Sequence, residues 1–124
     1  MRVLSIAWLG ISTTKENYLP LVSFLHDTMN MKIEFEEPST TELSLESHGR
    51  VQVFGPGTHY HQFFARNATG PIVALLEVDD IDAAKAELDT AAIKILGNLE
   101  SDKNWTWLSF RAPDGNLYEL GSRR

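Results

Sequence analysis

Alternation of apolar and polar residues predicts most of the strands in this chain. Side chains point alternately to the two faces of a strand, so a period of two marks a strand with one buried face. A continuous apolar run of the same length indicates a strand buried on both faces. These patterns predict eight strands, at residues 3–11, 31–37, 42–47, 50–55, 71–78, 93–100, 104–112 and 116–121.

A period near 3.6 predicts two helices, over residues 17–30 and 80–92. In the first, one face carries Tyr18, Leu21, Val22, Leu25 and Met29. Because proline is tolerated only in a first turn, Pro20 predicts a start near Asn17 or Tyr18. Asn30 suits the left-handed residue that ends a helix. In the second helix, Asp80 is the expected N-cap. The shared apolar face of this helix is Ile81, Ala84, Leu88 and Ala91.

Residues 55–70 show neither period cleanly, and we interpret them as a structured loop or crossover. The predicted order is then β-α-β-β-β, a loop, and β-α-β-β-β again. This repeat gives two half-modules, about 1–57 and 70–124, in a single domain of 124 residues. The corresponding fold class is α+β, with two tandem βαβββ modules forming a curved mixed sheet and helices outside.

Composition narrows the possible partners. The formal net charge of −6 argues against nucleic acid, whose phosphates require a basic surface, and suits a neutral or cationic ligand. No segment has the ~20 apolar residues of a membrane span, and the N-terminal run alternates like a strand rather than a signal peptide. The chain has no cysteine. We therefore expect a cytoplasmic protein with no nucleic-acid or membrane partner.

The C-terminal segment holds the most informative carboxylate. Pro113-Asp114-Gly115-Asn116 is a strong turn signal between two apolar strands. Glu119 follows in the second strand, Leu117-Tyr118-Glu119-Leu120. It could be a metal ligand, a general base, a polar anchor for a ligand or a solvent-facing residue.

Three segments together resemble the vicinal-oxygen-chelate superfamily of glyoxalases, bleomycin-resistance proteins and extradiol dioxygenases. They are "VSFLHDTMNMKIEF", "LLEVDDIDAAKAEL" and "FRAPDGNLYEL", in that order on a duplicated strand-helix pattern. The resemblance covers nearly the whole chain. It implies that the sheet curls into an open cup, and that the protein is a homodimer.

Metal-using members of this family take up to four ligands from strand positions inside the cup. By the resemblance, these positions fall near Ile6, Gln52, Val73 and Glu119. Only Glu119 is a good ligand, whereas divalent metals require several oxygen or imidazole donors. We therefore expect no metal and no cofactor, with Glu119 reused as a polar anchor or as a catalytic base.

Two histidines keep a metal site open as an alternative. His59 and His61 flank Tyr60, and on an extended segment both rings would point the same way. Together with Glu119 they could form a facial triad. The competing interpretation is that they are surface residues or lie at a dimer contact.

Alternation also selects the residues expected to line the cup. Trp8 shares a face with Ile6, Phe54 with Gln52, and Leu117 with Glu119. Trp105 and Trp107 share a face with Ser109 and Arg111; the opposite assignment would instead pack the tryptophans against a helix or a partner subunit. The predicted ligand-binding residues are Ile6, Trp8, Gln52, Phe54, Val73, Trp105, Trp107 and Glu119.

Three functions remain in view. The favoured one is binding of a small, aromatic or hydrophobic molecule in an apolar cup without the usual metal. The second is a metal-dependent lyase, isomerase or dioxygenase that uses Glu119 with His59 and His61. The third is an assembly or regulatory module whose cup is filled by its own side chains.

Overall fold

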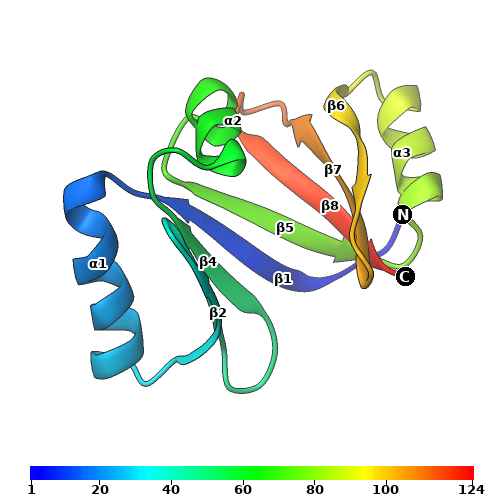
Figure 1. Cartoon of the computed structure of the whole chain (residues 1–124). Helices are drawn as coiled ribbons and strands as arrows, with labels where there is room; N and C mark the ends of the chain where they lie inside the picture. Colours follow the sequence, from blue (N-terminus) through cyan, green and yellow to red (C-terminus); the bar gives the residue numbers. More distant parts are fainter. The chain divides into compact units, whose positions relative to one another are not determined.

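The computed structural model describes all 124 residues, which form two compact units. The N-terminal unit is Trp8–Val73, and the C-terminal unit joins Met1–Ala7 to Ala74–Arg124. Figure 1 shows the elements in chain colours. No helix is both long enough and apolar enough to cross a membrane.

The strands and helices follow the predicted order, with two additions. The additions are a π-helical turn after the first helix and a helix between the two repeats. The elements are β1 (Val3–Ser12), α1 (Lys15–Ser23), η1 (Phe24–Thr28), β2 (Lys32–Glu37), β3 (Thr40–Ser44), β4 (Arg50–Phe54), α2 (His59–Asn67), β5 (Ile72–Val78), α3 (Ile81–Thr90), β6 (Lys94–Ser101), β7 (Trp105–Arg111) and β8 (Leu117–Arg123). The predicted α+β class with a repeated βαβββ order is confirmed.

In the N-terminal unit the strand order is β2-β3-β4-β1, with β1 parallel to β4 and the other pairs antiparallel. Alternate residues of these strands pack against α1 and η1. Leu43 and Val53 are fully buried there beside Val22 of α1. The opposite face of β1 and β4 therefore carries Trp8 and Gln52.

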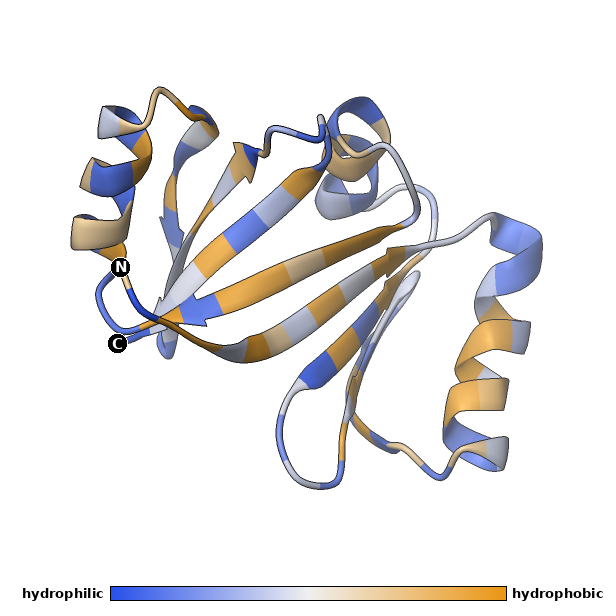
Figure 2. Cartoon of the chain, turned by 180° about the vertical axis from the view of Figure 1, so that it is seen from behind, coloured by the Kyte–Doolittle hydropathy of each residue, from blue (hydrophilic) through white to orange (hydrophobic).

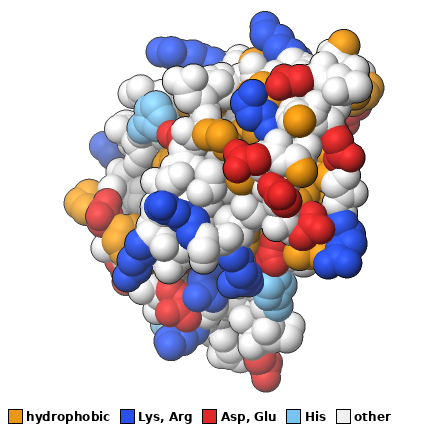
Figure 3. Space-filling model, turned by 90° about the vertical axis from the view of Figure 1, so that its right-hand side faces the viewer, with side chains coloured by type: hydrophobic (Ala, Val, Ile, Leu, Met, Phe, Trp, Pro, Cys, Tyr) orange, Lys and Arg blue, Asp and Glu red, His pale blue; other side chains and the backbone are white.

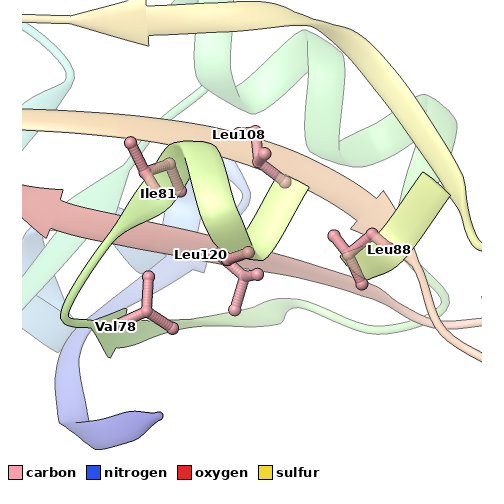
Figure 4. Packing of buried hydrophobic residues seen from close by; sticks show 6 residues of the cluster. Val78, Ile81, Leu88, Leu108 and Leu120 are labelled. Atoms are coloured by element: carbon pink, nitrogen blue, oxygen red, sulfur yellow. The ribbon is translucent and has the colours of Figure 1, made fainter. Parts of the chain in front are cut away.

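In the C-terminal unit the strand order is β5-β8-β7-β6, with β5 parallel to β8. Helix α3 packs on one face. Figure 4 shows its Ile81 and Leu88 against Val78, Leu108 and Leu120 of the strands. The alternation of polar and apolar residues that produces this face runs along the strands in Figure 2.

The first helix starts earlier than predicted. It begins at Lys15, where Thr14 caps it by accepting a hydrogen bond from the Asn17 amide at 3.2 Å. Pro20 therefore lies inside the helix, and the expected start near Asn17 or Tyr18 was wrong. Met29 was also misplaced on the buried face: it is 55% exposed, because the wider i→i+5 turn of η1 shifts it around the axis.

The segment 55–70, expected to be a loop, contains helix α2. Thr58 caps it by accepting from the His61 amide at 3.1 Å. Its buried face includes Phe64, which is 2% exposed, and Tyr60 lies one turn earlier. This four-residue spacing of aromatics and the cap were the overlooked signals.

The turn and cap predictions are confirmed. Gly115 has φ of 84°, and Ala112 and Asn116 close the hairpin between β7 and β8. Asn30 has φ of 58°, the left-handed conformation expected after a helix. Asp80 caps α3 through its carboxylate.

Candidate functional site

The sheet of the C-terminal unit has a second face, opposite the one that packs against α3. Leu108 and Leu120 point to α3, so their strand neighbours point the other way. Residues opposite one another on paired strands share a face. We call this the tryptophan face: Leu75 and Glu77 of β5, Trp105, Trp107, Ser109 and Arg111 of β7, and Leu117, Glu119, Gly121 and Arg123 of β8. The alternative that packs the tryptophans against a helix is wrong for α3, since Phe110 packs on that side.

Glu119 lies at the centre of this face and is almost completely buried, at 3% exposure. Ser109 on the neighbouring strand donates a hydrogen bond to Glu119 Oε2 at 2.9 Å. Burial raises the pKa of Glu119 to about 7; the Ser109 hydrogen bond opposes this rise and the nearby Glu100 carboxylate adds to it. Near neutral pH the group therefore exists in both forms, able to accept or to donate a proton.

Two half-buried tryptophans accompany Glu119. Trp107 lies opposite Gly121, and Trp105 lies opposite Arg123. The Arg123 guanidinium carbon lies 4.9 Å from the Trp105 ring centre. This face thus combines aromatic surface with two buried carboxyl groups, those of Glu119 and Glu77, a combination suited to a flat organic molecule.

In the N-terminal unit, Trp8, Gln52 and Phe54 come together as alternation predicts. The Trp8 indole donates to Gln52 Oε1 at 3.0 Å, and its ring centre is 6.0 Å from that of Phe54. Phe64 of α2 covers them, with ring centres 6.2 Å from Trp8 and 5.9 Å from Phe54. Phe54 is 1% exposed, so in this conformation it supports Trp8 and offers no free surface.

The remaining predicted residues lie in contrasting environments. Val73 is completely buried, whereas Ile6 is 59% exposed. Val73 belongs to β5, where burial alternates along most of the strand, whereas the residues before Ala7 in β1 are exposed or half-buried. Neither has a polar atom on its side chain, so each can only supply apolar contact.

The two histidines do not pair as an extended segment would allow. Both belong to α2, where residues two apart do not face each other. The His61 ring nitrogen Nε2 lies 3.2 Å from the Thr13 carbonyl oxygen, and the His59 ring packs edge-on to Tyr60 at 5.5 Å. The alternative in which both rings point the same way from an extended segment is therefore wrong. Neither unit contains a group of three or more His, Asp or Glu side chains placed to hold a metal ion.

Sequence reasoning overlooked three residues at these faces: Glu77, Arg123 and Phe64. Glu77 and Arg123 follow from alternation, two residues beyond Leu75 and four beyond Glu119 on their strands. Phe64 required recognition of α2.

Comparisons with known proteins identify the family. The sequence profile of the Glyoxalase/Bleomycin resistance protein/Dioxygenase superfamily matches residues 17–120. No curated protein matches the chain in sequence.

Solved structures match the fold at low sequence identity. A glyoxalase/bleomycin resistance protein/dioxygenase superfamily member from Vibrio splendidus 12B01 is 19% identical, with a TM-score of 0.70 over 96% of this chain and 98% of its own. Methylmalonyl-CoA epimerase from Mycobacterium tuberculosis is 16% identical, with a TM-score of 0.71 over 98% and 89%. The Mn(II)-bound glyoxalase from Novosphingobium aromaticivorans is 20% identical, with a TM-score of 0.74 over 98% of this chain and 39% of its own. The chain belongs to the glyoxalase/bleomycin resistance protein/dioxygenase superfamily.

Proposed function

We propose that this protein binds a small, flat organic molecule on the tryptophan face of its C-terminal unit, without a divalent metal at the usual family position. The observation that carries the proposal is Glu119, a buried carboxyl group beside Trp107 whose pKa is about 7. The half-buried tryptophans would supply contact area. Glu119 would fix the orientation of the ligand through a hydrogen bond.

The protonation of Glu119 supports two roles at this site. In its neutral form the carboxyl can donate a hydrogen bond to a ligand carbonyl, as buried carboxylic acids do. In its ionised form it can remove a proton from a bound ligand, because its pKa lies close to the working pH. Glu119 is accordingly the catalytic residue if the ligand is also a substrate.

The residues of the N-terminal unit add a second proposed contact set. Trp8 and Gln52 are half-buried and joined by a hydrogen bond, so Gln52 keeps its amide N–H groups for a ligand while its oxygen is engaged. Ile6, which belongs to the C-terminal unit and is exposed on β1, is a separate proposed apolar contact. Phe54 and Val73 would act beneath the contact surface.

The donor set argues against the metal site of other family members. Ile6 and Val73 have no donor atoms, and Gln52 Oε1 already accepts from Trp8. Glu119 is then the single strong ligand among the four positions. The competing function is the metal-dependent lyase, isomerase or dioxygenase in which His59 and His61 complete the site; their placement on α2 gives it no support.

A metal titration tests the proposal. The purified protein is assayed for bound metal, and its thermal unfolding is then followed with Zn²⁺, Fe²⁺, Ni²⁺ and Mn²⁺. A metal bound only by the folded state at 100 times its Kd adds about 2.7 kcal/mol to stability. We expect no such increase. Stoichiometric metal that is lost in both Glu119→Gln and His61→Ala would establish the competing enzyme.

Tryptophan fluorescence tests the ligand site directly. The chain has three tryptophans, so two matched variants locate a quenching compound. We expect flat aromatic compounds to quench the wild type and Trp8→Phe, and to lose their largest effect in Trp107→Phe. Equal loss in both variants, or quenching that is unsaturable, contradicts a site on the tryptophan face.

A further inference from the structure

Arg123 covers one end of the tryptophan face. Its guanidinium carbon lies 4.9 Å from the Trp105 ring centre, within the range of a cation–π contact. Its side chain is nevertheless 61% exposed. Arg123 is the last residue of β8.

Beneath the guanidinium lies a second buried carboxylate. Glu77 has a side chain that is only 9% exposed, and its Oε2 atom lies 3.4 Å from Arg123 Nε. That separation is an ion-pair distance, yet Oε2 accepts no hydrogen bond. A buried acceptor without a donor is unfavourable, and a charged one more so. Arg123 thus balances the charge of Glu77 but donates no hydrogen bond to its Oε2 atom.

The glycine next to this carboxylate allows close packing. Gly121 pairs with Glu77 on one side and with Trp107 on the other, and the side chains of Leu75 and Trp105 come together over it. A Cβ atom at Gly121 would lie 3.1 Å from Leu75 Cδ2 and 3.3 Å from Trp105 Cε3. Any larger residue would therefore press on the Trp105 ring.

We propose that Glu77 and Trp105 form a binding site for an organic cation (a guanidinium, amidinium or substituted ammonium group) that Arg123 occupies until a ligand displaces it. A free planar cation can align its N–H groups with Glu77, which the tether of Arg123 to β8 prevents. It also stacks on Trp105 as Arg123 does. The inference rests on the proposed function, because the ligand would bind the same tryptophan face. It goes further in specifying that the ligand carries a positive charge.

The bulk electrostatics of the protein favour such a ligand. The net charge of −6 attracts cations to the surface. In Figure 3, which shows one side of the molecule, acidic, basic and apolar side chains are interspersed. An acidic surface attracts any cation, whereas the Glu77 site also offers a buried acceptor atom that a bound cation can contact.

The experiment compares three probes of similar size: benzamidine as the cation, benzyl alcohol as the neutral compound and benzoate as the anion. Binding to the 124-residue chain is measured by tryptophan fluorescence and by calorimetry at two salt concentrations. The variants are Arg123→Gln and Glu77→Gln. Their matched controls are Arg124→Gln, whose parent side chain donates to the Asp102 carbonyl instead, and Glu16→Gln, which replaces an exposed residue of α1.

We expect benzamidine to bind more tightly than both other probes. Arg123→Gln should strengthen its binding about tenfold, because the internal competitor is removed, a factor equivalent to about 1.4 kcal/mol. Arg124→Gln makes the same change in net charge and should have little effect. Glu77→Gln should remove the preference for the cation while thermal unfolding verifies that the variant folds.

The outcomes separate this inference from the proposed function. The cation site is overturned if benzyl alcohol binds as tightly as benzamidine. It is also overturned if Arg123→Gln weakens benzamidine binding, or changes it no more than Arg124→Gln does. In each of these cases the proposed site for an aromatic ligand is still supported. If none of the three probes binds saturably, both proposals fail. Thermal unfolding of Arg123→Gln verifies that this variant also folds; because its parent side chain is 61% exposed, we expect that it does, and the comparison with Arg124→Gln then decides the test without Glu77→Gln.

Discussion

The pKa of Glu119 makes the stability of this protein depend on pH in an unusual direction. Replacing Glu119 by glutamine removes the ionisable group but keeps the shape and an oxygen that can accept from Ser109. We expect the stability of Glu119→Gln to be closest to that of the wild type at pH 4.5 and below. At pH 8 and above it should be the more stable protein.

The sign follows from counting protons. The ordinary pKa of the carboxyl is 4.5, and burial raises the pKa of Glu119 to about 7 in the folded state. Between these values the folded protein keeps a proton that the unfolded chain has lost, so stability falls as pH rises. Below 4.5 both states are protonated and no penalty applies. Above about 7 the penalty is complete and, at about 1.36 kcal/mol per pH unit, amounts to about 3 kcal/mol.

Urea unfolding, followed by tryptophan fluorescence between pH 4.5 and 8.5, measures this directly. The quantity to compare is the unfolding free energy of Glu119→Gln minus that of the wild type. The contributions of the other titrating groups are the same in both proteins and cancel in this difference. The control is Glu100→Gln, which removes an exposed carboxylate near Glu119 and should retain most of the pH slope. A difference that stays constant across this pH range would refute the account of Glu119 as a destabilised buried acid.

Two further substitutions test the packing and the caps. Gly10→Ala would place a Cβ atom against Trp8 Cη2, so we expect the unfolding free energy in urea to fall by about 1–3 kcal/mol. Gly70→Ala, whose Cβ atom would meet no atom within 4 Å, should change the unfolding free energy little, and equal effects of the two variants would contradict close packing of Trp8. Asp80→Ala removes a cap that accepts a hydrogen bond from the Asp82 amide at 3.0 Å, and it should lower the unfolding free energy by about 1 kcal/mol. Asp80→Asn keeps a capping oxygen and should lower it less. Indistinguishable melting of these two variants would argue against the cap.

The sequence alone determined the strands and their faces. Alternation is a local property of the backbone, so Trp105 and Trp107 could be assigned to one face and Leu108 to the other without any tertiary information. The turn at residues 113–116 and the Asp80 cap were equally readable, because each depends on a few adjacent residues. The family resemblance rested on the same kind of local segment, and the match of the family profile to residues 17–120 confirms it.

Tertiary structure decided what depends on residues far apart in the chain. Helix α2 is only nine residues long, and short helices are stabilised mainly by packing; Phe64 gains its burial against Trp8 and Phe54, which lie in other elements. The raised pKa of Glu119 comes from desolvation, which no local pattern reports. The approach of Arg123 to Trp105 and Glu77 likewise requires the register of three strands, since each supplies one partner.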